Sequence, residues 1–241
     1  MIVYRLKQLF LRRRFTFMTS YTLTRSNRRT VAIHIRNGAV EVRAPIKMPK
    51  HEIDNFVISK ENWITKRLAI SREQAMRRNN FALTYGDHVT YRGKRYPITK
   101  KPGDHVGFDG TSFYMPPDLS PEQIKRACIR VYRMLAERDI IKRAYLFAVI
   151  MAVLPSDVRI NSAKSRWGSC SGKDSVNFSW LLIMADDDLI DYVIVHELAH
   201  ITELNHSSRF WAIVERVIPE YRELKARLRD LQNELANEDW S

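Results

Sequence analysis

Residues 192–211 read YVIVHELAHITELNHSSRFW, and this stretch decides how the rest of the chain is interpreted. Its apolar residues predict a helix that ends near Asn205. Within a helix, His196 and His200 lie one turn apart on the same face, so one metal ion can bind both imidazoles. Glu197 follows the first histidine, where its carboxylate can reach a metal-bound water rather than the metal itself. These residue types at this spacing predict a zinc hydrolase centre with Glu197 as the general base.

The third ligand of such a centre must come from beyond the end of the helix. A catalytic zinc usually has three protein ligands and one open position for water. His206 follows His200 by six residues and is the preferred third ligand. Three downstream carboxylates are rival candidates: Glu215, Glu220 and Glu223. Because the chain must turn sharply to bring His206 back, we expect Asn205 to adopt a left-handed conformation at this turn.

The composition is that of a globular protein rather than a disordered or membrane-spanning one. The chain has 241 residues, of which 45% are hydrophobic and 28% are charged. No apolar run approaches the roughly 18–20 residues that a membrane-spanning helix needs, which excludes an integral membrane protein. Two cysteines are too few for a disulfide framework, and the N-terminal residues do not follow the order of a signal peptide. We therefore expect a cytoplasmic protein that has no membrane partner.

Positive charge is concentrated in the first part of the chain. Residues 1–101 carry 23 Lys and Arg against 6 Asp and Glu, whereas residues 102–241 carry 17 against 21. A field of this sign attracts nucleic acid or another polyanion without reading base sequence. The clustered cations that could contact phosphates are Arg12, Arg13, Arg14, Arg67, Arg72, Arg77 and Arg78. The sequence therefore suggests a non-specific nucleic acid or other anionic partner, with a solvated basic surface as the simpler alternative.

The order of elements predicts an α+β protein. A strand pair joined at Asn37-Gly38 reads as a hairpin, and residues 50–79 read as one basic helix. Ser120 is placed to cap a long helix over 121–153. The three expected parts are a disordered extension over 1–18, a basic β-rich region over 19–118 and a catalytic domain over 119–241.

Three segments before the histidine helix predict adjacent short strands: DVRINSA, SRWGSC and SVNFSWLLI. In a peptidase of this type an edge strand can pair with an extended peptide, and either of the last two segments could be that strand. Arg166 and Asn177 are candidate transition-state stabilisers, although ordinary hydrogen bonding at strand ends also explains them. Cys170 is better explained as a small buried residue than as a ligand or nucleophile.

These motifs resemble the YgjP-like family of metal-dependent hydrolases, which is related to the SprT-like and Wss-type zincins. The resemblance rests on RWGSCS (166–171), VNFSWLLI and the histidine stretch, and it extends to TLTRSNRRTVAIHI and TYGDHVTYRGKRYPI in the N-terminal part. It implies a zincin-like catalytic fold, with a three-stranded sheet and an HExxH helix, behind a β-rich N-terminal region. It also implies zinc ligands at His196, His200 and His206 and a catalytic glutamate at Glu197.

The sequence thus predicts a zinc-dependent hydrolase, first of all a metallopeptidase acting on a peptide or protein. In this interpretation Zn²⁺ on the three histidines holds a water that Glu197 activates. One alternative keeps the metal but cleaves a nucleotide or another phosphoanhydride, although the chain contains no GxxxxGK[ST] loop. A second alternative is a nucleic-acid-binding module with a structural zinc, although such a zinc usually has four protein ligands.

Overall fold

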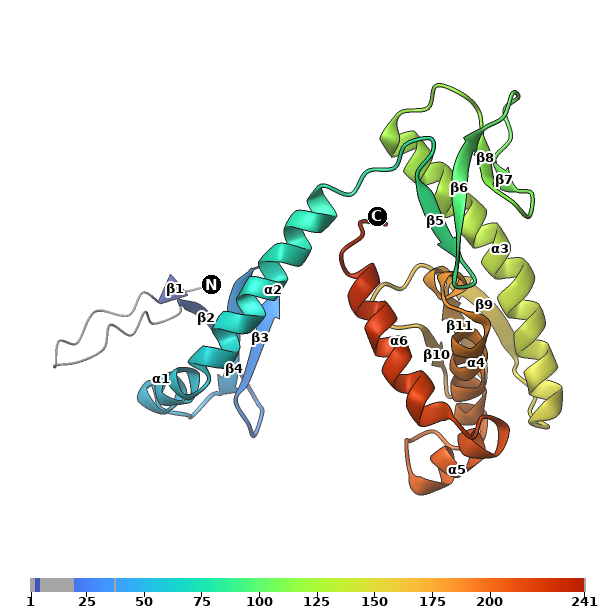
Figure 1. Cartoon of the computed structure of the whole chain (residues 1–241). Helices are drawn as coiled ribbons and strands as arrows, with labels where there is room; N and C mark the ends of the chain where they lie inside the picture. The colour runs from blue at the N-terminus through green and yellow to red at the C-terminus, as the bar shows by residue number, and fades with distance from the viewer. Residues whose placement is uncertain (1–2, 5–19, 37, 241) are drawn as a thin grey trace. The chain divides into compact units, whose positions relative to one another are not determined.

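The computed structural model of the chain describes residues 3–4, 20–36 and 38–240. Within these residues the protein is mixed α+β, with six α-helices and three small sheets (Figure 1). The chain divides into two compact units, one up to Phe81 together with 236–239, and one over Ala82–Leu235 together with Trp240. The predicted boundary between the β-rich region over 19–118 and the catalytic domain over 119–241 stays a prediction. The expected extension over 1–18 lies outside the described residues except for Val3–Tyr4, and so does the cluster of Arg12, Arg13 and Arg14.

The first unit is built on a four-stranded sheet. In the order β1-β2-β4-β3 its strands are Val3–Tyr4, Tyr21–Ser26, Ala39–Pro45 and Ala32–Arg36. β2 runs parallel to β4, and β3 pairs antiparallel with β4. Gly38, in the turn between β3 and β4, has a φ of 74°, which glycine adopts at no steric cost. The predicted hairpin is confirmed on these two strands, and Asn37 of its turn lies outside the described residues.

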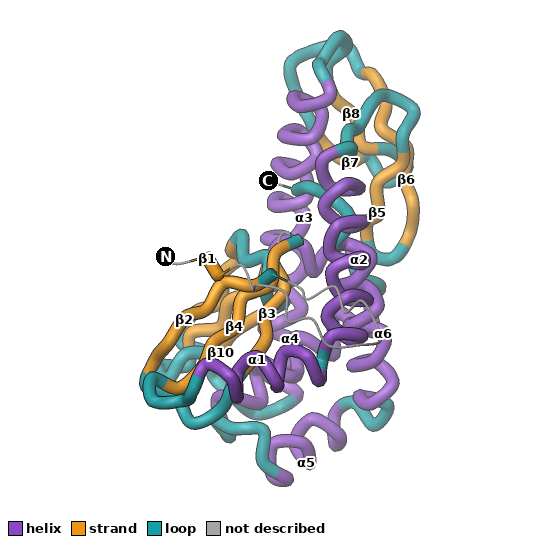
Figure 2. Tube along the Cα trace, turned by 90° about the vertical axis from the view of Figure 1, so that its left-hand side faces the viewer, coloured by secondary structure: helices purple, strands orange, loops and turns teal. Residues whose placement is uncertain are grey.

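Two helices, α1 (Lys50–Ser59) and α2 (Glu61–Asn79), lie against this sheet (Figure 2). The alternation of β4 turns Val40, Val42 and Ala44 inward, where they join Ile53 and Val57 of α1 and Ile64 of α2 in one buried core. The expected single helix over 50–79 is two helices, because Lys60 leaves the helical conformation with φ −108° and ψ 7°. The exposed side of α2 carries Arg67, Arg72 and Arg77.

The second unit contains two sheets. The first, in the order β5-β6-β8-β7, consists of His88–Tyr91, Lys94–Lys100, Phe113–Met115 and Gly107–Phe108. The second, in the order β10-β11-β9, consists of Gly168–Cys170, Ser175–Ser179 and Asp157–Asn161. β11 runs parallel to β9 and antiparallel to β10. Of the two segments expected to include a substrate strand, β11 therefore lies in the middle of the sheet and β10 lies at its edge.

Four α-helices complete this unit: α3 (Pro121–Ile150), α4 (Asp187–Thr202), α5 (Ser208–Val217) and α6 (Tyr221–Leu235). α3 begins with the capping that the sequence predicts, since the Ser120 hydroxyl accepts the N–H of Gln123 and the Gln123 side chain accepts the N–H of Ser120. Tyr132 of α3 packs against the rings of Phe113 and Trp180, so the helix contacts both β8 and the segment that follows β11.

The last part of the predicted third strand is helical instead. Trp180–Met184 form a short 3₁₀ helix (η1), because the Ser179 hydroxyl accepts the N–H of Leu181 and starts a turn after β11. This turn buries Trp180, Leu182 and Ile183 beneath α3 and delivers the chain to the start of α4. In the described part of the chain, no helix combines the length and the apolar character needed to cross a membrane.

Candidate metal centre

Helix α4 carries the candidate metal centre, and most of its side chains are buried. The Asp186 carboxylate caps the helix by accepting the N–H of Leu189 at 3.1 Å. Asp187 and Asp188 occupy the first turn, where negative charge suits the helix dipole. The buried residues of α4 are Leu189, Ile190, Tyr192, Val193, Ile194, Val195, Glu197, Leu198 and Ala199. A helix packed in this way holds its side chains in fixed positions.

Three arginines from three other elements bind the carboxylates at the start of α4. Arg92, in the turn between β5 and β6, donates two hydrogen bonds of 2.6 Å to Asp187. Arg143 of α3 lies 3.3 Å from the same carboxylate, and Arg227 of α6 binds Asp186 at 2.7 Å. Hydrogen bonds from Arg92 and the positive charge of Arg143 hold the pKa of Asp187 below its usual value, against the effect of burial. The start of the helix is therefore fixed from three directions.

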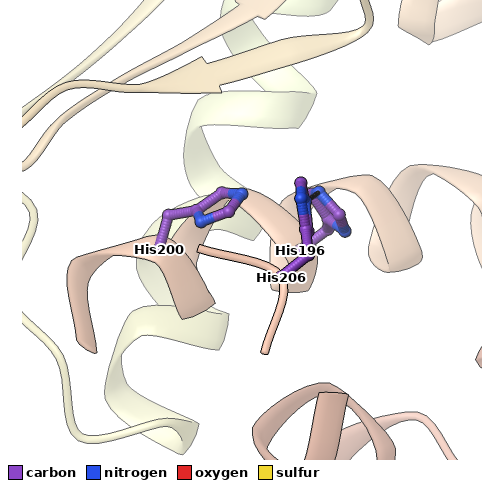
Figure 3. Close-up of side chains that lie close together, drawn as sticks. All are labelled: His196, His200 and His206. Carbon is purple, nitrogen blue, oxygen red and sulfur yellow. Dashed lines mark hydrogen bonds between the residues drawn. The ribbon is translucent and has the colours of Figure 1, made fainter. Parts of the chain in front are cut away.

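The structure brings together the three histidines that the sequence predicts as ligands. His196 and His200 extend from α4, and His206 comes from the loop between α4 and α5 (Figure 3). Their ligand nitrogens all lie within 4.8 Å of one another, and Nε2 of His196 lies 3.0 Å from Nε2 of His206. In a tetrahedral site with metal–nitrogen bonds of about 2.0–2.1 Å the ligand nitrogens lie about 3.3–3.4 Å apart, so nitrogens separated by up to 4.8 Å have to move closer when one ion binds.

Extended backbone at Glu203 returns the chain to the site. α4 ends at Thr202, and Glu203 has φ −138° and ψ 104°. The carbonyl oxygen of Glu203 lies 3.1 Å from Nδ1 of His200, so the turn also orients this imidazole. The prediction of a left-handed Asn205 is wrong, since Asn205 is not among the described residues with positive φ. The extended conformation of Glu203 redirects the chain without it.

The electrostatic surroundings favour neutral imidazoles. Burial, followed by repulsion from His200 and His206, lowers the pKa of His196 to about 3. Burial, followed by the charges of His200 and Lys225, also lowers the pKa of His206. Neutral imidazole is the form that binds a metal.

The donor set fits a divalent metal ion. Within the described residues, Nδ1 of His196 is buried without a hydrogen-bond partner, so the polar contacts of this ring must come from the Nε2 side. There Nε2 faces Nε2 of His206, and at most one proton can lie between them. A cation that accepts both lone pairs satisfies the two nitrogens at once.

Glu197 lies beside the histidines with only 8% of its surface exposed. Burial raises the pKa of its carboxyl group to about 7, against the opposing charge of Arg166. Its side chain packs against Gly168 of β10, where a Cβ atom would lie 2.5 Å from Cγ and 2.9 Å from Cδ and Oε1 of Glu197. Gly168 thus provides the space that the carboxylate occupies. This role of Gly168 was not predicted, and the available signal for it is a glycine inside a predicted strand.

Two aromatic residues of α5 contact the histidines directly. Phe210 is fully buried, and its ring centroid lies 4.5–4.9 Å from those of His196, His200 and His206. Trp211 stacks on His206 with 5.7 Å between centroids and 22° between planes. Both rings therefore contact the candidate ligands themselves.

The other candidate residues lie outside the cluster. Among the described residues, only the three histidines form a group able to hold a metal, so the rival glutamates do not join it. Glu215 instead binds Arg222 at 2.8 Å. Asn177 lies in the central strand β11, and Cys170 lies in β10, where burial followed by the charge of Glu197 raises the pKa of its thiol to about 11.

The family model of the YgjP-like metallopeptidase domain matches residues 29–231. The chain therefore belongs to the YgjP-like family. Membership supports a metal-dependent peptidase with a divalent metal cofactor. Among solved structures, the metallopeptidase zymogen of Pyrococcus abyssi abylysin is 26% identical, with 37% of this chain and 90% of that chain covered and a TM-score of 0.35. The metallopeptidase zymogen of Methanocaldococcus jannaschii jannalysin is 22% identical, with 38% and 95% covered and a TM-score of 0.35. A comparison with curated proteins gives no match.

Proposed function

We propose that this member of the YgjP-like family is a zinc-dependent metallopeptidase in which His196, His200 and His206 hold the metal and Glu197 is the general base. The observation that carries the proposal is the convergence of three imidazole nitrogens within 4.8 Å, beside a buried carboxylate on the same helix. Three protein ligands with an open fourth position are typical of catalytic zinc, whereas structural zinc usually has four.

The strand arrangement supports a zincin-like layout and a peptide substrate. β10 lies at the edge of the sheet β10-β11-β9 and contacts α4 through Gly168 and Glu197. An extended peptide that pairs with this edge would pass close to the general base. Main-chain hydrogen bonds along β10 would then provide binding that depends little on the side chains of the substrate.

The proposed mechanism assigns the proton transfers to Glu197. When bound, zinc would polarise the scissile carbonyl and lower the pKa of a water molecule toward about 7. A carboxylate oxygen of Glu197 accepts a proton from the attacking water as the new C–O bond forms. It then gives this proton to the leaving nitrogen as the C–N bond breaks. Arg166, whose charge acts on Glu197, is the proposed stabiliser of negative charge on the carbonyl oxygen.

The test compares hydrolysis of two probes by the zinc-loaded full chain. Fluorescein-labelled casein serves as the unfolded protein, and ATP serves as the phosphoanhydride. We expect release of labelled peptides without ATP hydrolysis. Glu197→Gln should keep one zinc per chain and reduce the cleavage rate by about 10²–10⁴-fold, because it removes the proton acceptor.

The matched control is Glu215→Gln, which makes the same change at a rival ligand. Because Glu215 binds Arg222 rather than joining the histidines, this variant should retain both zinc and activity. Native cleavage by Glu197→Gln would show that the proposed base is wrong. Loss of zinc from Glu215→Gln but not from His206→Ala would exclude His206 as the third ligand.

A further inference from the structure

Among the described residues that form the candidate metal centre, His206 is the histidine that does not lie on helix α4. His196 and His200 extend from a buried helix, whereas His206 is an exposed residue of the loop between α4 and α5. Nδ1 of His200 also contacts the carbonyl oxygen of Glu203. Within the described residues, the His206 ring makes one hydrogen bond, to Nε2 of His196. That contact joins two candidate ligands, and a bound metal would replace it.

A ligating histidine usually has its orientation fixed by a hydrogen bond from its second ring nitrogen. The His206 imidazole is instead oriented by stacking against an aromatic ring. Trp211 of α5 lies nearly parallel to the imidazole, with 22° between planes and 5.7 Å between centroids. Phe210 meets the same imidazole edge to face, at 4.7 Å and 82°. Together the two rings restrict both the tilt and the lateral position of the imidazole.

The stack continues into α6, which fixes the tryptophan in turn. Trp211 and Tyr221 are stacked at 5.0 Å with 14° between their planes, and Tyr221 is buried. The ammonium group of Lys225 lies 4.7 Å from the centroid of the Trp211 ring. A tryptophan held by a buried neighbour and a cation has little freedom to rotate. It therefore presents a fixed face to the loop that carries His206.

The geometry points to Trp211 as a positioning residue that orients the His206 imidazole for metal binding. This inference rests on the proposed metal site and adds to it a residue that does not touch the metal. The stack takes the place of a hydrogen bond to Nδ1 of His206, which no group in the described part of the chain makes. Its contribution appears as metal affinity and as the rate at which metal leaves, because the loop otherwise has to order its imidazole on binding.

The experiment separates the aromatic face of Trp211 from its apolar bulk. Trp211→Phe keeps a ring, whereas Trp211→Leu supplies an apolar side chain without one. Trp63→Leu is the matched control, since Trp63 is partly exposed on α2 in the first unit. Zinc affinity is measured on the full chain by competition with a chromogenic chelator, and the Co²⁺ form is examined by visible absorption. Thermal unfolding of the metal-free proteins reports their folding.

We expect Trp211→Leu to bind zinc about two- to tenfold more weakly, to release it faster and to alter the Co²⁺ spectrum. Trp211→Phe should lie closer to the native protein, and Trp63→Leu should equal it. Equal affinities of Trp211→Leu and the native chain would overturn the inference, as would equal weakening in the Leu and Phe variants. A native chain that binds no zinc would overturn the proposed function as well, so the two failures can be told apart.

Discussion

The contact between Gly168 and Glu197 predicts that a single added methyl group will impair catalysis. In Gly168→Ala, the new Cβ would lie 2.5 Å from Cγ of Glu197, whereas ordinary contacts begin at 3.4 Å. Cγ must therefore move by ~0.9 Å. The backbone at this position accepts alanine without strain, because Gly168 is not among the glycines with positive φ. The perturbation is therefore confined to the position of the carboxylate.

The effects on stability and on catalysis should differ in size. The atoms in the way belong to a side chain and not to the backbone, so a shift of the Glu197 side chain can relieve the overlap, and the loss of stability should be about 1 kcal/mol, near the lower limit for overpacking. A loss of this size lowers the melting temperature by about 2–4 °C in a domain of this length. A general base misplaced by about 1 Å can lose 10²-fold in rate, and we expect a loss of that order.

The assay measures cleavage of labelled casein, zinc content and thermal unfolding on the same preparations. Gly172→Ala is the matched control, because a Cβ there meets no atom within 4 Å and the residue lies in the turn that follows β10. It should cleave at the native rate. A Gly168→Ala variant that retains more than half of the native rate with full zinc content would contradict the prediction. Equal loss of activity in both glycine variants would contradict it as well.

Two further predictions concern the arginines at the start of α4 and the free thiols. Arg92→Ala should lower the free energy of unfolding at pH 7 by about 0.5–1 kcal/mol, since both partners of its ion pair are partly exposed. Because the folded pKa of Asp187 lies below the unfolded value of 3.8, this contribution is present above pH 4 and is lost as the pH falls through the folded pKa. Denaturant unfolding at pH 7 and pH 3 tests this, and an equal difference at both pH values would contradict it. Burial raises the pKa of Cys128 to about 12 and that of Cys170 to about 11, so the folded protein should react slowly with iodoacetamide at pH 8 and faster above pH 10. Rapid labelling of either thiol of the folded protein at pH 8 would contradict the raised pKa values. In the denatured chain both cysteines should be labelled rapidly.

Local signals in the sequence predicted the parts of the fold that depend on a few neighbouring residues. The capping of α3 by Ser120 follows from a side chain that bonds to the N–H group three residues away. The break at Lys60 and the 3₁₀ helix after Ser179 were not predicted. In both places the apolar pattern continues, so periodicity alone gives no boundary.

The same distinction applies to the candidate site. The spacing of His196 and His200 predicted their common face because a helix fixes it. The position of His206 depends on the extended backbone of Glu203. The sequence pattern instead predicted a turn at Asn205, which was wrong. The contact of Gly168 with Glu197 and the stack of Trp211 on Tyr221 join segments that are distant in sequence or lie on different helices. Such contacts are products of tertiary packing, and a local signal such as the strand glycine at 168 does not identify the residue that it contacts.

The edge strand β10 has only three residues, Gly168–Cys170. An antiparallel partner can exchange about two main-chain hydrogen bonds with so short an edge. At about 0.5–1.5 kcal/mol for each bond, this pairing alone gives a dissociation constant for a peptide that is millimolar or weaker. If the chain cleaves proteins as proposed, pairing with β10 alone would not saturate at micromolar substrate concentrations. Substrate specificity would then depend on whether a polypeptide has lost its folded structure, and much less on which amino acids flank the cleaved bond.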